Sequence, residues 1–429
     1  MNRSAIYLVV LSMSLFMWNC SAESANDSDS TDQQGVEQSV EEDQGNYLLK
    51  QGFWIGKLRI SKSQVLPFNM EVVKDSVYFI NAEERIGALI VQEGEQLVIE
   101  MPIFDSEFRI SKNDIGLFGY WHNYAKSPDY KIDFTAEPID KESYDNRFGI
   151  PSSSNVTNFE GNWETTFDIG SEGAYKALGL LLQVNQDVKG TFLTETGDYR
   201  FLQGNAHGDS LYLSAFDGSH AFLFAAEMDG DTLRGTFFSG NHYQNNWVAF
   251  RNDEFELRNP DSLTRLKIGE EFAFTFPGID GKDVAYPSPK YTEEVVIIQL
   301  LGSWCPNCMD ETKFLNDLYA NYKDKGLHII GIAFENPETL EGKIERVKEL
   351  ADYYGIEYEL CIGGYASKKE AELALPALSE VLSFPTTIFI DKDGQIRKIH
   401  TGFNGPGTGP YYLKFVESTN KFIQKMLNE

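Results

Sequence analysis

The first half of the chain alternates between apolar and polar residues over many short stretches. Between residues 52 and 137, turn residues separate these stretches every eight to twelve positions. Alternation with a period of two is typical of strands that bury one face. The stretches expected to form strands are residues 54–60, 70–73, 76–80, 88–91 and 96–100. A second segment of this kind covers residues 159–251, so the first half is predicted to be all-β.

The second β segment repeats motifs of the first in the same order. The pairs are residues 52–54 with 161–163, residues 94–99 with 208–213, and residues 117–121 with 233–237. Their offset grows from 109 to 116 residues, as insertions in loops would produce. Each unit begins with Gly-x-Trp and ends in strands that carry glycine beside aromatic residues, which resembles a small lipocalin-like barrel or a sandwich of hairpins. Two barrels and one larger barrel both remain open.

The last part of the chain alternates strands with helices. Strands are expected at residues 272–276, Val295–Leu301, and residues 328–334, 358–362, 386–391 and 395–400. Helices are expected at residues 308–325, 340–354, 373–382 and 412–427. This alternation is typical of an α/β domain. The predicted fold is therefore a multi-domain chain, with a duplicated all-β region followed by an α/β domain.

The first 46 residues have the composition of an export signal and a tether. Arg3 precedes an apolar run, residues 5–18, that is too short for a comfortable membrane span. Cys20 follows and resembles the lipidated cysteine of bacterial lipoproteins, although Asn19 stands where a small residue is usual. The alternative is an ordinary cleaved signal with an incidental Cys20. Residues 21–46 hold eight Asp and Glu and no Lys or Arg, which predicts a flexible acidic tether.

These patterns divide the chain into seven segments. They are the signal (1–20), the tether (21–46), the first β repeat (47–138), a linker (139–158), the second β repeat (159–251), a hinge (252–267) and the α/β domain (268–429). We expect an exported protein, anchored in the lipid membrane through Cys20. Its expected place is the periplasmic side of the cell envelope, with the outer membrane as the alternative.

Charge and cysteine content narrow the range of functions. The formal net charge of −28 over 429 residues disfavours nucleic acid as a partner. Apart from Cys20, the chain contains Cys305, Cys308 and Cys361. Three cysteines are too few for a framework of stabilising disulfides in a protein of this size. Cys361 lies in an apolar stretch and is predicted to be a buried, unreactive thiol.

Cys305 and Cys308 lie where the strand Val295–Leu301 gives way to a helix. The unpaired N–H groups and the positive dipole at a helix start stabilise a thiolate, so a solvent-side Cys305 should have a pKa below about 8.5. Two intervening residues make about one helical turn, so Cys308 can form a disulfide with Cys305. Zinc binding and a stable structural disulfide are the alternatives. No second pair of ligands accompanies the two cysteines, so we expect a redox pair without a metal or other cofactor.

This region resembles the TlpA/ResA-like branch of exported thioredoxin-fold disulfide oxidoreductases. The matches are Trp304-Cys305-Pro306-Asn307-Cys308, Glu311, Phe384-Pro385-Thr386 and residues 388–394. The resemblance covers residues 268–429. It implies that Cys305 is the nucleophile, that Cys308 resolves the mixed disulfide, and that Pro385 is a cis-proline facing the pair. It also implies that Trp304, Pro306, Phe384 and Thr386 contact the substrate.

Glu311 matches a glutamate of the same family pattern. It follows Cys308 by three residues and therefore lies on the same helix face. We expect it to accept the proton of Cys308, with a raised pKa if it is desolvated. A solvated glutamate in a first helical turn is the alternative.

The expected function is that of an anchored, exported thiol-disulfide oxidoreductase that reduces disulfides of periplasmic proteins. Its partners would be disulfide-containing exported proteins and a membrane electron donor. The alternative is a lipoprotein whose β domains bind a ligand or protein, with aromatic residues such as Trp121, Tyr124, Tyr243 and Trp247 as candidate lining. A peroxidase is a third possibility, against which the intact Cys305/Cys308 pair argues.

Overall fold

The computed structural model describes residues 47–153 and 155–429. The predicted signal, Cys20 and the acidic tether lie outside the described residues. Among the helices of the described part, none combines the length and the apolar character that a membrane crossing requires.

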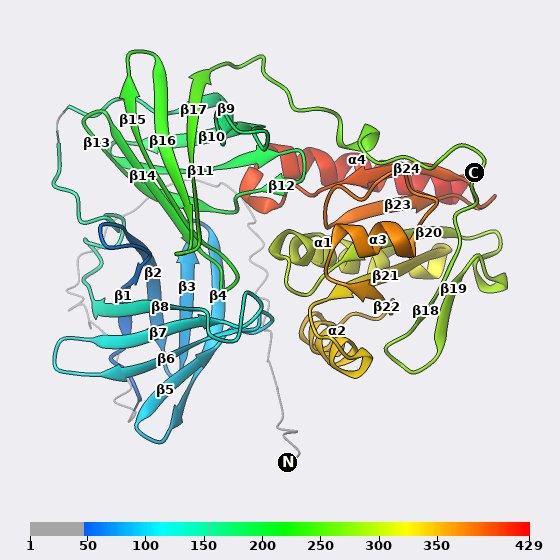
Figure 1. Ribbon diagram of the computed structural model, residues 1–429, viewed down its shortest axis with the longest axis horizontal. Helices are drawn as coiled ribbons and strands as arrows, with labels where there is room; N and C mark the ends of the chain where they lie inside the picture. The colour runs from blue at the N-terminus through cyan, green and yellow to red at the C-terminus, as the bar shows by residue number, and fades with distance from the viewer. Residues whose placement is uncertain (1–46, 154) are drawn as a thin grey trace, which may run out of the picture. The chain divides into compact units, whose positions relative to one another are not determined.

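The first repeat forms a closed eight-stranded antiparallel barrel (Figure 1). Its strands are β1 Gly52–Arg59, β2 Val65–Val73, β3 Ser76–Asn81, β4 Glu84–Glu93, β5 Gln96–Glu100, β6 Ser106–Lys112, β7 Leu117–Asn123 and β8 Lys131–Pro138. The barrel closes because β1 pairs with both β2 and β8. Aromatic rings fill its core: the Phe108 ring lies 5.3 Å from that of Phe79 and 4.7 Å from that of Phe134.

The second repeat forms a further barrel. Its strands are β9 Gly161–Phe167, β10 Tyr175–Val184, β11 Asp187–Thr194, β12 Gly197–Asp198, β13 Leu202–His207, β14 Ser210–Phe216, β15 Ala221–Asp229, β16 Thr232–Ser239 and β17 Tyr243–Arg251. Eight of them close into a ring because β10 pairs with both β9 and β11. The short strand β12 pairs with β11 outside that ring. Phe167, Phe192 and Phe224 pack in its core.

The paired motifs occupy equivalent places in the two barrels. Trp54 lies in the first strand of one barrel and Trp163 in the first strand of the other. Each indole N–H donates to the carbonyl four residues earlier, that of Lys50 and that of Phe159, at 2.9 Å. The other two motif pairs fall in the fifth and the seventh strands of each ring. The repeat therefore forms two barrels, and both the sandwich and the single larger barrel are wrong; the lipocalin-like relationship stays a prediction.

The segment between the barrels carries a buried arginine. Arg147 donates to the carbonyl of Ile80 at 2.9 Å, the carbonyl of Ser214 at 3.1 Å and Oε1 of Gln203 at 3.0 Å. Because Ile80 belongs to the first barrel and the other two acceptors belong to the second, Arg147 connects the two barrels.

The last part of the chain contains a five-stranded mixed sheet of order β22-β21-β20-β23-β24. Its strands are β20 Val295–Leu301, β21 Leu327–Glu335, β22 Glu359–Tyr365, β23 Thr386–Ile390 and β24 Ile396–Thr401. Strand β20 is buried at every position and pairs parallel to β21 and antiparallel to β23. A hairpin, β18 Phe274–Pro277 and β19 Asp283–Tyr286, precedes the sheet. Four single-turn 3₁₀ segments are Pro260–Ser262, Pro289–Tyr291, Lys323–Lys325 and Pro406–Thr408.

Four helices accompany this sheet (Figure 1). They are α1 Pro306–Tyr322, α2 Leu340–Tyr354, α3 Lys368–Ala374 and α4 Pro410–Asn428. Helices α1 and α4 contact each other through the rings of Phe314 and Phe415, whose centroids are 5.4 Å apart. Helix α1 therefore packs against both the sheet and a neighbouring helix.

The helix expected at residues 373–382 is misplaced. Helix α3 begins earlier, because the Ser367 side chain accepts a hydrogen bond from the N–H of Glu370 and caps it. It ends at Ala374, because Pro376 disfavours a helical backbone at the residue before it. Leu375 indeed has φ −125° and ψ 66°.

The core of the first barrel gives a test of the fold. Phe108→Ala removes a buried ring that contacts several other aromatic rings, so it should destabilise the barrel by about 3–5 kcal/mol. Urea unfolding of the full chain measures this as a lower midpoint. Phe118→Ala, at an exposed site in the same barrel, is the control and should change the midpoint little. Equal effects of the two substitutions would contradict the packing described.

Candidate active site

Cys305 and Cys308 form a disulfide at the start of α1, with their Cα atoms 5.2 Å apart. Cys305 caps the helix in an extended conformation, and its Sγ accepts a hydrogen bond from the Cys308 N–H at 3.2 Å. Pro306 takes the first helical position, where its missing N–H leaves no hydrogen bond unmade. An N–H donor at the positive end of a helix stabilises a thiolate on Cys305 once the disulfide is reduced.

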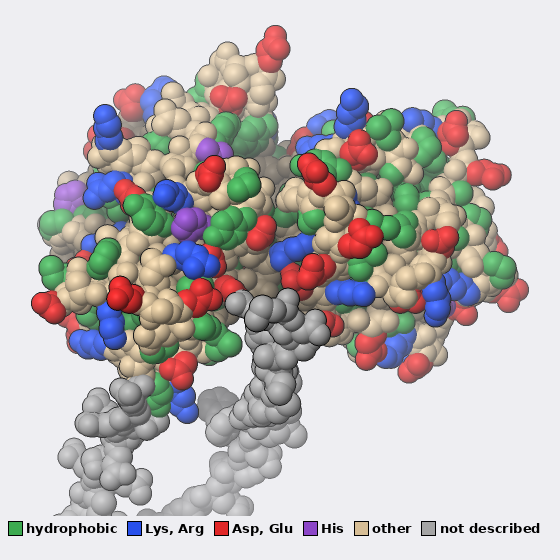
Figure 2. All heavy atoms as spheres, turned by 60° about the horizontal axis from the view of Figure 1, so that its bottom comes forward, with side chains coloured by type: hydrophobic (Ala, Val, Ile, Leu, Met, Phe, Trp, Pro, Cys, Tyr) green, Lys and Arg blue, Asp and Glu red, His purple; other side chains and the backbone are tan. Residues whose placement is uncertain are grey.

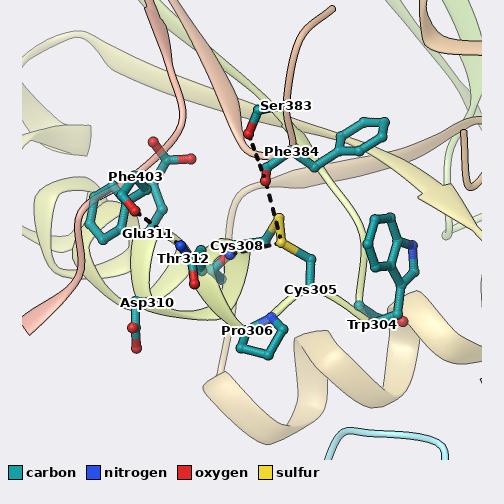
Figure 3. Close-up of a disulfide and its surroundings, with 12 residues drawn as sticks. Trp304, Cys305, Pro306, Cys308, Asp310, Glu311, Thr312, Ser383, Phe384 and Phe403 are labelled. Carbon is teal, nitrogen blue, oxygen red and sulfur yellow. Dashed lines mark hydrogen bonds between the residues drawn. A yellow bond between two sulfur atoms is a disulfide. The ribbon is translucent and has the colours of Figure 1, made fainter. Parts of the chain in front are cut away.

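Cys305 is less accessible than the sequence predicted. Its exposed fraction is 7%, so the expectation of a solvent-side cysteine is wrong. Its Sγ lies 3.5 Å from the carbonyl oxygen of Phe384. The Trp304 and Phe384 rings meet edge to face at 5.8 Å beside the disulfide (Figure 3). The second barrel also contacts this region, because Ser219 Oγ donates a hydrogen bond to the Trp304 carbonyl at 3.2 Å.

The Phe384–Pro385 peptide bond is cis, as the resemblance implied. Side chains around this bond hold the loop in place. Ser383 Oγ donates to the Thr196 carbonyl of the second barrel at 2.9 Å. Thr386 is fully buried and its hydroxyl donates to the Ser383 carbonyl at 2.8 Å. The hydroxyl of Thr386 thus supports the loop from inside, and the contact of Thr386 with substrate stays a prediction.

Glu311 is buried beneath the disulfide-bearing turn of α1, with 1% of its surface exposed (Figure 3). Thr387 Oγ1 donates to one carboxyl oxygen at 2.7 Å, and Gln299 Nε2 donates to the other at 2.9 Å. Burial raises the pKa of Glu311 to about 7, although these two hydrogen bonds oppose the rise. The solvated alternative is therefore wrong. A carboxyl group with this pKa exchanges protons readily near neutral pH.

A second buried carboxyl group supports the segment before Cys305. Glu335, at the end of β21, accepts hydrogen bonds from the N–H and the hydroxyl of Ser303, both at 2.7 Å. The neighbouring Phe334 carbonyl accepts from the Trp304 indole N–H at 2.9 Å. Burial raises the pKa of Glu335 to about 7. Glu335 was not predicted from the sequence, because it lies 27 residues after Cys308 and belongs to no local motif.

Two more charged residues that sequence analysis missed meet at the first turn of α1. The Asp310 carboxylate pairs with Arg200 of the second barrel, and Arg200 Nη1 also lies 3.4 Å from the Pro306 carbonyl. The sequence does place Asp310 next to Glu311 and two residues after Cys308, which indicates a carboxylate near the reactive pair. Nothing in the sequence around Arg200 indicated such a contact.

The remaining cysteine of the described residues belongs to the hydrophobic core. Cys361 is buried in β22 and is not in a disulfide, and burial raises its pKa, which confirms the prediction of a buried thiol. Within residues 47–153 and 155–429, no three His, Cys, Asp or Glu side chains are grouped so that they could hold a metal ion.

Comparisons with known proteins match the C-terminal region of the chain. Residues 269–412 match the Redoxin family. Thiol-disulfide oxidoreductase ResA of Halalkalibacterium halodurans is 31% identical over 107 residues, which is 25% of this chain and 53% of that protein. ResA of Bacillus thuringiensis subsp. konkukian is 27% identical over 135 residues, which is 31% of this chain and 68% of that protein. The chain thus spans about half the length of the first relative and about two thirds of the second.

Two solved structures share the region at lower similarity. A putative protein disulfide isomerase from Bacteroides thetaiotaomicron is 25% identical, with 39% of this chain and 93% of that chain covered and a TM-score of 0.29. A putative thiol:disulfide interchange protein DsbE from Chlorobium tepidum is 21% identical, with 36% and 93% covered and a TM-score of 0.28. The family match and the ResA relatives confirm that the C-terminal region is similar to ResA thiol-disulfide oxidoreductases.

Proposed function

We propose that the protein is a thiol-disulfide oxidoreductase that reduces disulfide bonds of exported proteins through Cys305 and Cys308. The observation that carries this proposal is the disulfide at the start of α1, with the Cys308 N–H directed at Cys305 Sγ. The cis Phe384–Pro385 bond beside it and the buried Glu311 give further support. The similarity to ResA proteins agrees with the same chemistry.

The reaction proceeds through a mixed disulfide. The Cys305 thiolate attacks one sulfur of the substrate disulfide, forming a new S–S bond and releasing the other substrate sulfur as a thiolate. Cys308 then gives its proton to Glu311 and attacks Cys305 Sγ. The substrate sulfur that was bonded to Cys305 leaves and is protonated, and the Cys305–Cys308 disulfide forms. Two electrons thus pass to the substrate, and a dithiol donor must return two electrons to the pair.

The proposed location and partners are supported only by the sequence. The export-type segment, Cys20 and the acidic tether support a protein anchored by lipid in the cell envelope, with the periplasmic side as the proposed location. A membrane electron donor would then supply the dithiol. The net charge of −28 speaks against nucleic acid as a partner. Acidic and basic side chains lie interspersed over the face in Figure 2.

The binding alternative has less support. Trp121 and Trp247, offered as lining of a ligand cavity, are fully buried in the barrel cores. Trp121 stands edge-on to Phe216 at 5.1 Å, and Trp247 packs against Phe192 at 5.5 Å. These tryptophans serve packing in both barrels.

Cysteine substitutions test the proposed order of attack. Cys308→Ser should accumulate a covalent mixed disulfide between Cys305 and a disulfide-containing reporter protein, because the resolving thiol is absent. Cys305→Ser should form none and should lose reductase activity. Cys361→Ser, which changes a buried thiol in β22, is the control and should keep wild-type activity. Non-reducing electrophoresis and mass spectrometry measure the adduct. An adduct on Cys308 in place of Cys305 would contradict the assignment.

The role of Glu311 predicts a pH dependence. Its carboxylate accepts a proton only when ionised, so the rate of mixed-disulfide resolution should rise as pH increases through about 7. Glu311→Gln should lose this rise and slow resolution by about 10²-fold or more above pH 7. Stopped-flow mixing of the reduced protein with a reporter disulfide from pH 5 to 9 measures the profile.

A surface carboxylate provides the control for that experiment. Glu417, on α4, forms an exposed pair with Lys421, and Glu417→Gln should retain the wild-type profile. If Glu311→Gln keeps both the wild-type rate and the wild-type pH profile, Glu311 is not the proton acceptor.

A further inference from the structure

Arg200 of the second barrel is buried among carboxylates from three parts of the chain. It lies between β12 and β13 and pairs with Glu84 of the first barrel, with Asp310 of α1 and, at 3.7 Å, with Asp217 of the second barrel. Asp198 lies close by and accepts a hydrogen bond from the Arg200 backbone N–H at 2.7 Å. The side chains of Arg200 and of the three carboxylates paired with it are largely shielded from solvent.

The cluster contains more carboxyl groups than cationic groups. One guanidinium faces four carboxyl groups, and Nδ1 of His220 lies 3.1 Å from Asp217. Burial raises the pKa of Asp198 to about 6 and also raises that of Glu84. A buried charge is costly unless it is paired, so Arg200 is the group that compensates this cluster.

The same guanidinium contacts the start of the helix that carries the reactive pair. Nη1 of Arg200 lies 3.4 Å from the carbonyl oxygen of Pro306, which stands between Cys305 and Cys308 in the chain. The same nitrogen pairs with Asp310, two residues after Cys308. Arg200 therefore contacts the first turn of α1 on both sides of Cys308, from outside the α/β domain.

A charge in this position acts on the thiolate that forms at Cys305. A nearby cation favours a thiolate, a nearby carboxylate disfavours it, and both effects are strong where water is excluded. Because reduction of the disulfide produces this thiolate, a group that stabilises it also makes the disulfide easier to reduce. Arg200 and Asp310 should therefore act in opposite directions.

We propose that Arg200 is a positioning residue for the Cys305–Cys308 pair, and that the second barrel is thereby part of the redox site. Arg200 holds the start of α1 through Pro306 and Asp310 and places a positive charge against the turn that carries the reactive pair. This inference rests on the proposed oxidoreductase function and gives the second barrel a role in it.

Arg147 provides a matched control. It is also a buried arginine that joins separate parts of the chain. Its hydrogen bonds go to Ile80, Ser214 and Gln203, all of them in the two barrels. Arg147→Met therefore tests the general cost of losing a buried arginine cation, without a change at α1.

The test measures how readily the disulfide is reduced in the full chain. Wild type, Arg200→Met, Arg200→Lys, Asp310→Asn and Arg147→Met are equilibrated in graded thiol buffers at pH 8. The equilibrium constant for reduction should fall about tenfold in Arg200→Met, which corresponds to about 30 mV for this two-electron couple. It should rise in Asp310→Asn, return towards wild type in Arg200→Lys, and stay unchanged in Arg147→Met. The pKa of reduced Cys305, from its rate of alkylation, should rise in Arg200→Met and fall in Asp310→Asn.

The outcomes separate this inference from the proposed function. If the wild-type pair exchanges but Arg200→Met and Asp310→Asn leave it unchanged or shift it in the same direction, Arg200 only joins the domains and the inference fails. If Arg200→Met does not fold, the other two variants still test the inference. The equilibrium constant for reduction should rise in Asp310→Asn and stay near the wild-type value in Arg200→Lys. If the wild-type pair does not exchange with any thiol buffer, the proposed function itself fails.

Discussion

The hydrogen bond from the Cys308 N–H to Cys305 Sγ places the reactive sulfur at the positive end of α1. This bond depends on the abrupt change from the buried strand β20 to a helix within the residues 302–305. Glu335 and Phe334 fix the backbone and the indole of that short segment from the neighbouring strand β21. The remaining features of the site are arranged around a sulfur whose position is set by the end of one strand and the start of one helix.

Exclusion of water is the second condition of this site. The cis-proline loop and Trp304 cover the disulfide, and the second barrel bonds to both through Thr196 and Ser219. The same exclusion of water raises the pKa of Glu311 to about 7, because an ionised carboxylate is costly to bury. The burial that limits access to the pair thus also raises the pKa of its proposed proton acceptor. Under the proposal for Arg200, the second barrel is part of the redox site and contacts it at the ionic cluster around that residue.

Local patterns predicted the elements well and the long-range contacts poorly. Strand Val295–Leu301 was predicted with its observed bounds, because its β-branched run is buried at every position. The duplication was found because glycine and tryptophan recur at fixed places in each barrel. The helix at 373–382 was misplaced because Pro376 ends the helix at Ala374, although the apolar pattern continues beyond it. The burial of Cys305 and the contact of Arg200 with α1 could not be predicted, because both depend on how segments about 100 residues apart pack together.

The central claim is that Cys305 and Cys308 form a redox pair that cycles in the folded protein. The most direct test is to titrate the purified wild-type protein between reduced and oxidised thiol buffers and to quantify the disulfide by mass spectrometry. The account predicts one reversible two-electron transition, with a midpoint near or below roughly −250 mV for a reductase, since thioredoxin lies at about −270 mV. A disulfide that neither opens nor re-forms across that range would contradict the account, and the function would then have to be sought in the barrels.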